Sequence, residues 1–186
     1  MTVSSDLDRR FRDAASTLEL VDVSYDVLET EIGPLLAAVT DHGLAFLSFD
    51  ANADERLESL ATFAGSRVLR TTRGVELVRR ELDEYFGGRR TIFDLSLDLR
   101  GLPQFTVSVL GELAKVPYGR TATYRDLAER VGNPKASRAV GTVMNRNRIP
   151  IILPCHRIVG TSGSLVGYAG GLELKEKLLR LEGAIL

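Results

Sequence analysis

The chain has 186 residues, of which 44% are hydrophobic and 26% are charged, and its formal net charge is −1. This composition is that of a globular protein with a sizeable core, and no stretch approaches the ~20 apolar residues that a membrane span needs. The single cysteine excludes an internal disulfide framework and a multi-cysteine zinc site. Because a free thiol suits a reducing compartment, we expect a cytoplasmic protein.

The two halves of the chain carry opposite charge. Residues 1–100 hold 12 Lys and Arg against 19 Asp and Glu, a net of −7, whereas residues 101–186 hold 12 against 6, a net of +6. A basic half indicates an anionic partner, and nucleic acid is the leading candidate. Alternatively, the two halves simply attract each other.

The first hundred residues predict a helical extension, a small antiparallel sheet and two helices. A polar extension covers residues 1–18, with a helix over 5–17. Alternation of apolar and polar residues from Val21, and turn signals at 33–34 and 41–43, predict three strands, the last two at 35–39 and 44–49. Amphipathic patterns predict helices at 53–64 and 75–86. A link without periodicity follows at 89–103, and we place a domain boundary after residue 99.

The second half predicts helix, turn, helix, helix, strand, loop, helix. The first helix covers 104–115. A capping-box pattern from Thr123 to Asp126 begins the second, and Gly132 ends it. Asn133 then caps a helix at 134–146 with Pro134 at its first position. This tight helix–Gly–helix joint is the outline of a helix-turn-helix. The apolar run 149–153 predicts a buried strand, and the last helix covers 172–182.

The helix at 134–146 has a core stripe and an exposed flank. Arg138 projects from a flank of small residues, so the helix could approach DNA closely. Alternatively, the small residues let another helix pack there and Arg138 is only solvated. The stripe consists of Ala136, Val140, Val143 and Met144, and the flank includes Ser137, Ala139, Gly141 and Thr142.

Cys155 lies between Pro154 and His156, directly after the apolar run. A thiolate is a strong nucleophile, and a neighbouring imidazole is a usual means of generating one. Proline tends to end a buried strand, so we expect both side chains in a turn at the mouth of the core, facing one cavity. The alternative is that Cys155 is only a small buried hydrophobic residue.

A catalytic histidine needs an orienting carboxylate, and Glu182 is the candidate. Other acidic residues of the last helix have basic partners four positions away, whereas Glu182 has none and lies at the helix C-terminus, where the dipole disfavours an anion. A solvated terminal Glu is the alternative. The Gly-rich segment 163–171 lacks the phosphate-loop pattern, and with Tyr168 it forms either a wall for a planar ligand or a surface loop.

Several separated motifs occur in order around the cysteine. Together they resemble the O6-alkylguanine-DNA alkyltransferases, or methylated-DNA–protein-cysteine methyltransferases, over residues 102–183. They are VPYGRTATY at 116–124, GNPKA at 132–136, RAVG at 138–141, Asn147, IPIILPCHR at 149–157, Ser162-Gly163, YAGGL at 168–172, and Lys175 with Leu178-Leu179. Residues 84–90, 93–94 and 98–101 are also similar to the family.

The resemblance implies an α+β fold with a ribonuclease-H-like N-terminal α/β domain at 1–99 and a mainly helical domain at 100–186. The second domain would carry the helix-turn-helix and the active-site cysteine. Cys155 would be the alkyl acceptor, His156 would take its proton through a water, and Glu182 would hold His156. Asn147 would brace the active-site turn.

The same resemblance implies a set of DNA and substrate contacts. Tyr124 would help to rotate the nucleotide and would bind the guanine or its phosphate. Arg138 would fill the gap left by the flipped base. Further implied DNA contacts are Thr123, Ala136, Ser137 and Gly141, and the guanine-pocket residues would be Ile158, Tyr168, Ala169 and Gly170.

The implied reaction is a direct displacement that happens once per protein. The partner would be double-stranded DNA containing O6-alkylguanine, bound through the minor groove by a monomer, with the nucleotide taken out of the stack. The thiolate would keep the alkyl group as a thioether. We expect no cofactor and no metal, because the cysteines of the vertebrate relatives' zinc site are missing. Acceptance of O4-alkylthymine depends on pocket volume and stays open.

Two departures and two other readings accompany the resemblance. The chain has no tryptophan, and Ala169 stands where some family members have serine. The first alternative function is that of a lesion-binding or helix-turn-helix regulatory protein in which Cys155 is structural. The second is a Cys-His hydrolase that turns over many times without DNA.

Overall fold

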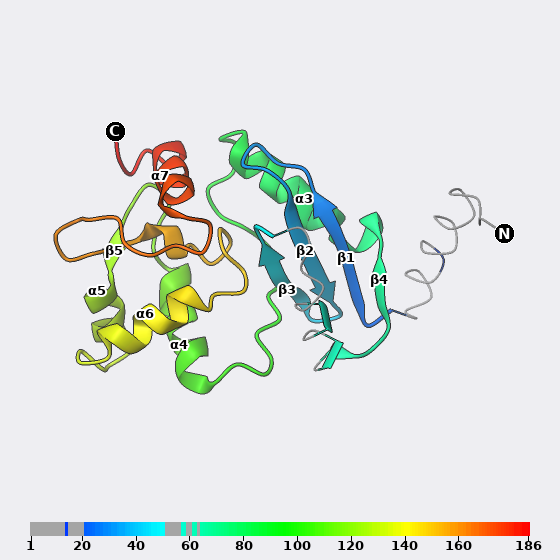
Figure 1. Ribbon diagram of the computed structural model, residues 1–186, viewed down its shortest axis with the longest axis horizontal. Coiled ribbons are helices and arrows are strands. Elements are labelled where there is room, and N and C mark those ends of the chain that lie inside the picture. Colours follow the sequence, from blue (N-terminus) through cyan, green and yellow to red (C-terminus); the bar gives the residue numbers. More distant parts are fainter. Residues whose placement is uncertain (1–13, 15–20, 51–56, 59–60, 63) are drawn as a thin grey trace. The chain divides into compact units, whose positions relative to one another are not determined.

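A computed structural model describes residues 14, 21–50, 57–58, 61–62 and 64–186 (Figure 1). The chain divides into two compact units, Met1–Gly87 with Asp94–Asp98, and Gly88–Phe93 with Leu99–Leu186. The predicted extension at 1–18 lies outside the described residues except for residue 14, and the described positions within 53–64 are helical. Among the described residues, no helix is long and apolar enough to cross a bilayer.

The N-terminal unit is built on a four-stranded sheet. The strands β1 (Val23–Leu28), β2 (Leu35–Thr40) and β3 (Gly43–Ser48) form the predicted antiparallel meander. A fourth strand, β4 (Val68–Arg70), pairs in parallel with β1, so the order is β3-β2-β1-β4 and the sheet is mixed rather than purely antiparallel. The strand β4 was not predicted, because its three residues are too few to show an alternation of apolar and polar side chains.

The helix α3 (Thr72–Phe86) packs on β1 and β2. It begins earlier than the predicted residue 75 and ends at the predicted position before Gly87. Gly74 allows its first turn to approach β1, since a Cβ there would lie 2.3 Å from the Cβ of Ser24. The apolar side chains that α3 buries are Val75, Val78, Leu82, Tyr85 and Phe86.

The C-terminal unit is mainly helical, as predicted. In Figure 1 the helices α4 (Gln104–Ala114), α5 (Tyr124–Arg130) and α6 (Ser137–Asn145) lie together, and each contacts the other two. Two short parallel strands, β5 (Ala122–Thr123) and β6 (Ile158–Val159), join the start of α5 to the segment that follows the cysteine. The last helix, α7 (Leu172–Leu181), packs against η1 (Cys155–Arg157), a single 3₁₀ turn.

The helix-turn-helix is present, with one correction. The predicted capping box of α5 forms, because Thr123 Oγ1 accepts from the Asp126 amide at 3.1 Å while Asp126 accepts from the Thr123 amide at 2.7 Å. The helix α6 begins at Ser137 rather than at 134, and its N-cap is Ala136 instead of Asn133. Residues 133–136 form a turn closed by a 2.9 Å hydrogen bond between the end residues, a geometry that Pro134 in its second position favours.

The predicted strand at 149–153 is wrong. This apolar run folds into tight turns, with only an isolated bridge between Pro150 and Leu153. Prolines at 150 and 154 remove two backbone donors, and Ile151 adopts a φ of 73°, which no strand permits. Cys155 therefore enters η1 from a compact loop and not from the end of a strand.

Candidate active site

Cys155 begins η1 and is 95% buried, with 5% of its surface exposed. The Asn147 side-chain amide donates to Cys155 Sγ at 3.2 Å and to the Leu153 carbonyl at 2.8 Å. Burial raises the pKa of the Cys155 thiol to about 11, although the Asn147 hydrogen bond and the positive charge of Lys175 act in the opposite direction. The resting cysteine is therefore a protonated thiol that needs help to ionise.

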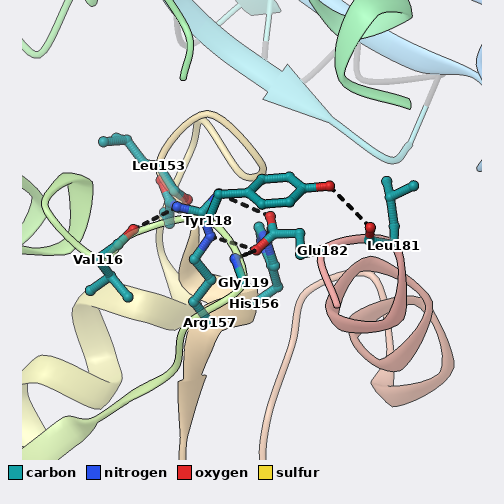
Figure 2. Close-up of polar contacts among 9 residues, drawn as sticks. Val116, Tyr118, Gly119, Leu153, His156, Arg157, Leu181 and Glu182 are labelled. Carbon is teal, nitrogen blue, oxygen red and sulfur yellow. Dashed lines mark hydrogen bonds and ion pairs between the residues drawn. The ribbon is translucent and has the colours of Figure 1, made fainter. Parts of the chain in front are cut away.

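His156 and Glu182 form a fully buried pair, shown in Figure 2. His156 Nε2 lies 2.8 Å from Glu182 Oε1, and both side chains have no exposed surface. Burial lowers the pKa of His156 and outweighs the opposing effect of Glu182, so the imidazole is neutral at neutral pH. Because an ionised carboxylate can only accept, we assign the proton of the neutral ring to Nε2. Nδ1 is then an acceptor, and within the described part of the chain it has no hydrogen-bond partner.

Arg157 binds the same carboxylate, a contact that was not predicted from the sequence. Its Nε donates to Glu182 Oε2 at 2.8 Å and its Nη2 to Glu182 Oε1 at 2.9 Å. Its Nη1 donates to the Val116 carbonyl at 2.6 Å, and the guanidinium carbon lies 5.8 Å from the centre of the Tyr118 ring. Burial alone would raise the pKa of Glu182, but hydrogen bonds from His156 and Arg157 lower it to about 2. Glu182 is therefore ionised throughout the neutral range.

The loop that leads into the helix-turn-helix is tied to the same carboxylate. The Gly119 amide donates to Glu182 Oε2 at 3.3 Å, and the Tyr118 hydroxyl donates to the Leu181 carbonyl at 3.0 Å (Figure 2). Gly119 has a φ of 71°, and a Cβ there would lie 2.9 Å from the Glu182 carbonyl oxygen. Only glycine fits this backbone and this approach. Glu182 thus joins α7, η1 and the loop before β5.

Lys175 is a second charged residue of the site whose burial was not predicted from the sequence. It is fully buried in α7, and its Nζ donates to the Ile158 carbonyl at 2.5 Å and to the Val166 carbonyl at 2.7 Å. Burial lowers its pKa to about 8, against the attraction of the Cys155 thiolate. A signal was available, because Lys175 is seven positions before Glu182 and so lies on the same face of the helix. The buried face of this segment consists of Lys175, Leu178, Leu179 and Glu182.

The predicted DNA contacts lie along α5, α6 and the turn between them. Arg138 is exposed on α6. Tyr124 begins α5, its hydroxyl lies 3.5 Å from the Val166 carbonyl, and its ring lies 3.9 Å from the position of a Cβ on Gly141. Burial and the nearby Cys155 raise the pKa of the Tyr124 hydroxyl, which therefore stays protonated. Thr123, Ala136, Ser137 and Gly141 are all half-buried, and the Thr123 hydroxyl is engaged in the capping box.

Two of the four predicted guanine-pocket residues, Ile158 and Tyr168, contact side chains of the site. Ile158 is buried in β6, and its carbonyl is already bound by Lys175. The Tyr168 ring meets the His156 ring edge to face, with centroids 6.4 Å apart. Ala169 is exposed and Gly170 half-buried in the loop before α7. Among the residues that the structure describes, no group of three His, Cys, Asp or Glu side chains is placed to hold a metal ion.

Two family models match this chain and together cover most of it. Residues 104–184 match the DNA binding domain of 6-O-methylguanine DNA methyltransferase, and residues 23–99 match its ribonuclease-like domain. The methylated-DNA–protein-cysteine methyltransferase of Methanosarcina acetivorans is 41% identical over 160 residues, which are 86% of this chain and 98% of the relative.

Solved structures agree with this match. The O6-methylguanine methyltransferase of Mycobacterium tuberculosis is 36% identical with a TM-score of 0.75, over 87% of this chain and 93% of that one. A structure of the same organism's OGT in complex with DNA has a TM-score of 0.76 at 35% identity, with the same coverage. The chain therefore belongs to the methylated-DNA–protein-cysteine methyltransferase family.

Proposed function

We propose that this protein repairs double-stranded DNA by moving the alkyl group of O6-alkylguanine onto Cys155, with His156 and Glu182 preparing the thiol. Family membership makes it an alkyl-transfer DNA repair protein. The observation that carries the assignment of roles is the buried pair of His156 and Glu182, 2.8 Å apart, directly beside the single cysteine. Asn147 donates to the sulfur and to the Leu153 carbonyl, which supports its role in bracing the active-site turn.

The proton path follows from the ionisation of the three side chains. A thiol with a pKa of about 11 is ionised in about one molecule in ten thousand at neutral pH, so proton removal must accompany the reaction. Nδ1 of neutral His156 is the acceptor, reached through a water, and the imidazolium that forms is stabilised by Glu182. Because Arg157 also binds Glu182, the carboxylate keeps its charge and the proton stays on His156.

The transfer itself is a displacement at carbon. A bond forms between Cys155 Sγ and the alkyl carbon while the bond from that carbon to O6 breaks. The guanine leaves with the electron pair and takes up a proton. A thioether has no easy leaving route, so each protein acts once.

The mode of DNA binding is also a proposal. The exposed face of α6 carries Arg138, and α5 presents Tyr124 near the pocket loop. A helix with small residues around one long cation suits a narrow groove, so we propose entry into the minor groove, where little base readout is available. We further propose that the protein acts as a monomer in the cytoplasm, where a free thiol stays reduced.

The test counts repaired bases. The protein is incubated with an excess of duplex DNA containing O6-methylguanine, and the restored guanine is measured after nuclease digestion. We expect one restored guanine per protein molecule, and none with Cys155→Ser. Continued turnover would identify a hydrolase, and tight DNA binding without any restored guanine would identify a lesion-binding or regulatory protein.

A further inference from the structure

The loop before the active-site cysteine contains two three-residue turns of opposite hand. The Ile152 amide donates to the Pro150 carbonyl at 2.9 Å across Ile151, and the Cys155 amide donates to the Leu153 carbonyl at 2.8 Å across Pro154. Pro154 has φ −80° and ψ 64°, which is the common, relaxed γ-turn. Ile151 has a φ of 73°, which is the rare γ-turn with the opposite sign.

Ile151 is in an unfavourable backbone conformation for its residue type. It is the only non-glycine residue with positive φ in the described part of the chain, and a β-branched side chain makes that conformation more costly. Such conformations persist only where the surroundings impose them, and they concentrate at functional sites. Here the surroundings are apolar, since Ile149 and Ile151 are fully buried and Leu153 is nearly so.

The strained turn is bonded to the group that contacts the sulfur. The Leu153 carbonyl, two residues after Ile151, accepts from both the Cys155 amide and the Asn147 side-chain amide. Asn147 Oδ1 accepts from the Ile149 amide at 3.1 Å, before the turn. The same Asn147 nitrogen reaches Cys155 Sγ. The turn therefore lies between the two backbone groups that hold Asn147 against the thiol, and a 3.0 Å hydrogen bond from the Leu153 amide to the Ile149 carbonyl closes the same loop.

We propose that Ile151 is a positioning residue: its buried side chain forces the loop into the strained γ-turn that aligns Asn147 with Cys155. This inference rests on the proposed function for its meaning in repair, although the turn can be tested without DNA. It predicts an unusual order of variants. A pure packing role predicts that Ala is tolerated better than Gly, because Ala fills more of the space left by Ile. A strained turn predicts that Gly is tolerated better than Ala, because Gly adopts positive φ without cost.

The experiment compares Ala and Gly at two neighbouring buried positions. Ile151→Ala and Ile151→Gly form the test pair, Ile149→Ala and Ile149→Gly the matched control pair, and Ile151→Val the conservative variant. Methyl transfer from duplex DNA is measured in single turnover at saturating DNA, at a temperature where circular dichroism shows every variant folded. The Asn147 side-chain amide resonances, recorded by NMR without DNA, report the hydrogen bond to sulfur.

We expect Ile151→Gly to transfer methyl about fivefold faster than Ile151→Ala, since a left-handed backbone penalises alanine but not glycine. We expect Ile151→Val to keep the wild-type rate and the wild-type Asn147 resonances. The Asn147 resonances of Ile151→Gly should lie nearer to those of the wild type than the resonances of Ile151→Ala do. At position 149, where φ is negative, Ile149→Ala should transfer methyl faster than Ile149→Gly. If Ala equals or exceeds Gly at both positions, the inference is overturned. If the wild type transfers no methyl, the proposed function fails, and the order of the Asn147 resonances still decides the role of Ile151.

Discussion

Replacing Glu182 by glutamine should remove a large part of the stability of the C-terminal unit. The variant keeps the size of the side chain but leaves the buried Arg157 guanidinium without a charged partner. In the folded protein the pKa of Glu182 is lowered from an ordinary 4.5 to about 2, and a difference of about 2.5 pKa units corresponds to about 3 kcal/mol at neutral pH. Loss of one partner of a buried ion pair costs about 3–5 kcal/mol, which agrees with that figure.

The pH dependence of this loss has a defined sign. Because the folded pKa lies below the unfolded one, the stabilisation by Glu182 is complete above about pH 4.5 and is lost as the pH falls towards 2. The free energy of unfolding is measured by urea denaturation of both proteins at neutral pH and at steps below pH 4.5. We expect the gap between wild type and Glu182→Gln to narrow along the acidic steps.

A matched control lies on the same helix. Glu176 pairs with Arg180 at 2.8 Å, but both side chains are about half exposed. Exposed pairs of this kind contribute about 0.3–0.5 kcal/mol, so Glu176→Gln should change the free energy of unfolding little at any pH. The reasoning is refuted if Glu182→Gln costs no more than Glu176→Gln, or if its cost is the same at every pH.

Three further substitutions test other parts of the site. Lys175→Met keeps the aliphatic stem but removes the ammonium that binds the Ile158 and Val166 carbonyls and lowers the thiol pKa, so methyl transfer should slow and its pH–rate curve should move to higher pH; an unmoved curve would contradict this. Arg138→Ala should weaken repair of duplex DNA more than it weakens reaction with the free O6-methylguanine base. An equal loss on both substrates would contradict the proposal that Arg138 fills the gap that the flipped base leaves in the DNA. Thr123→Ala removes the capping box of α5 and should cost about 1 kcal/mol in urea denaturation, and no measurable loss would count against that hydrogen bond.

The parts of the fold that follow local rules were predictable. The capping box at Thr123 and the apolar periodicity of α6 depend on residues three or four positions apart, and both are present in the structure. Glu182 could be singled out for a related reason, because the rest of its own helix offers it no partner. Its contact with His156, 26 positions earlier, was inferred because a catalytic histidine needs an orienting carboxylate, and not from any sequence pattern.

The parts that depend on distant or unusual contacts were not predictable. Arg157 stood in the quoted motif, but nothing local indicates that its guanidinium would share the carboxylate of Glu182. Lys175 was hidden because a charged residue on a helix is ordinarily solvated, and its burial depends on two carbonyls from other segments. The run containing Ile151 was expected to be a strand, because β-branched residues favour strands and only the packing imposes the turn.

The most direct test of the whole account is the mass of the protein after repair. Wild type and Cys155→Ser are each incubated with duplex DNA containing O6-methylguanine, and intact mass and peptide mapping locate any added group. We predict that the wild type gains one methyl group, on Cys155 alone and in proportion to the DNA consumed, and that the variant gains none. An unchanged wild-type mass, or a methyl group on any other residue, would contradict the account.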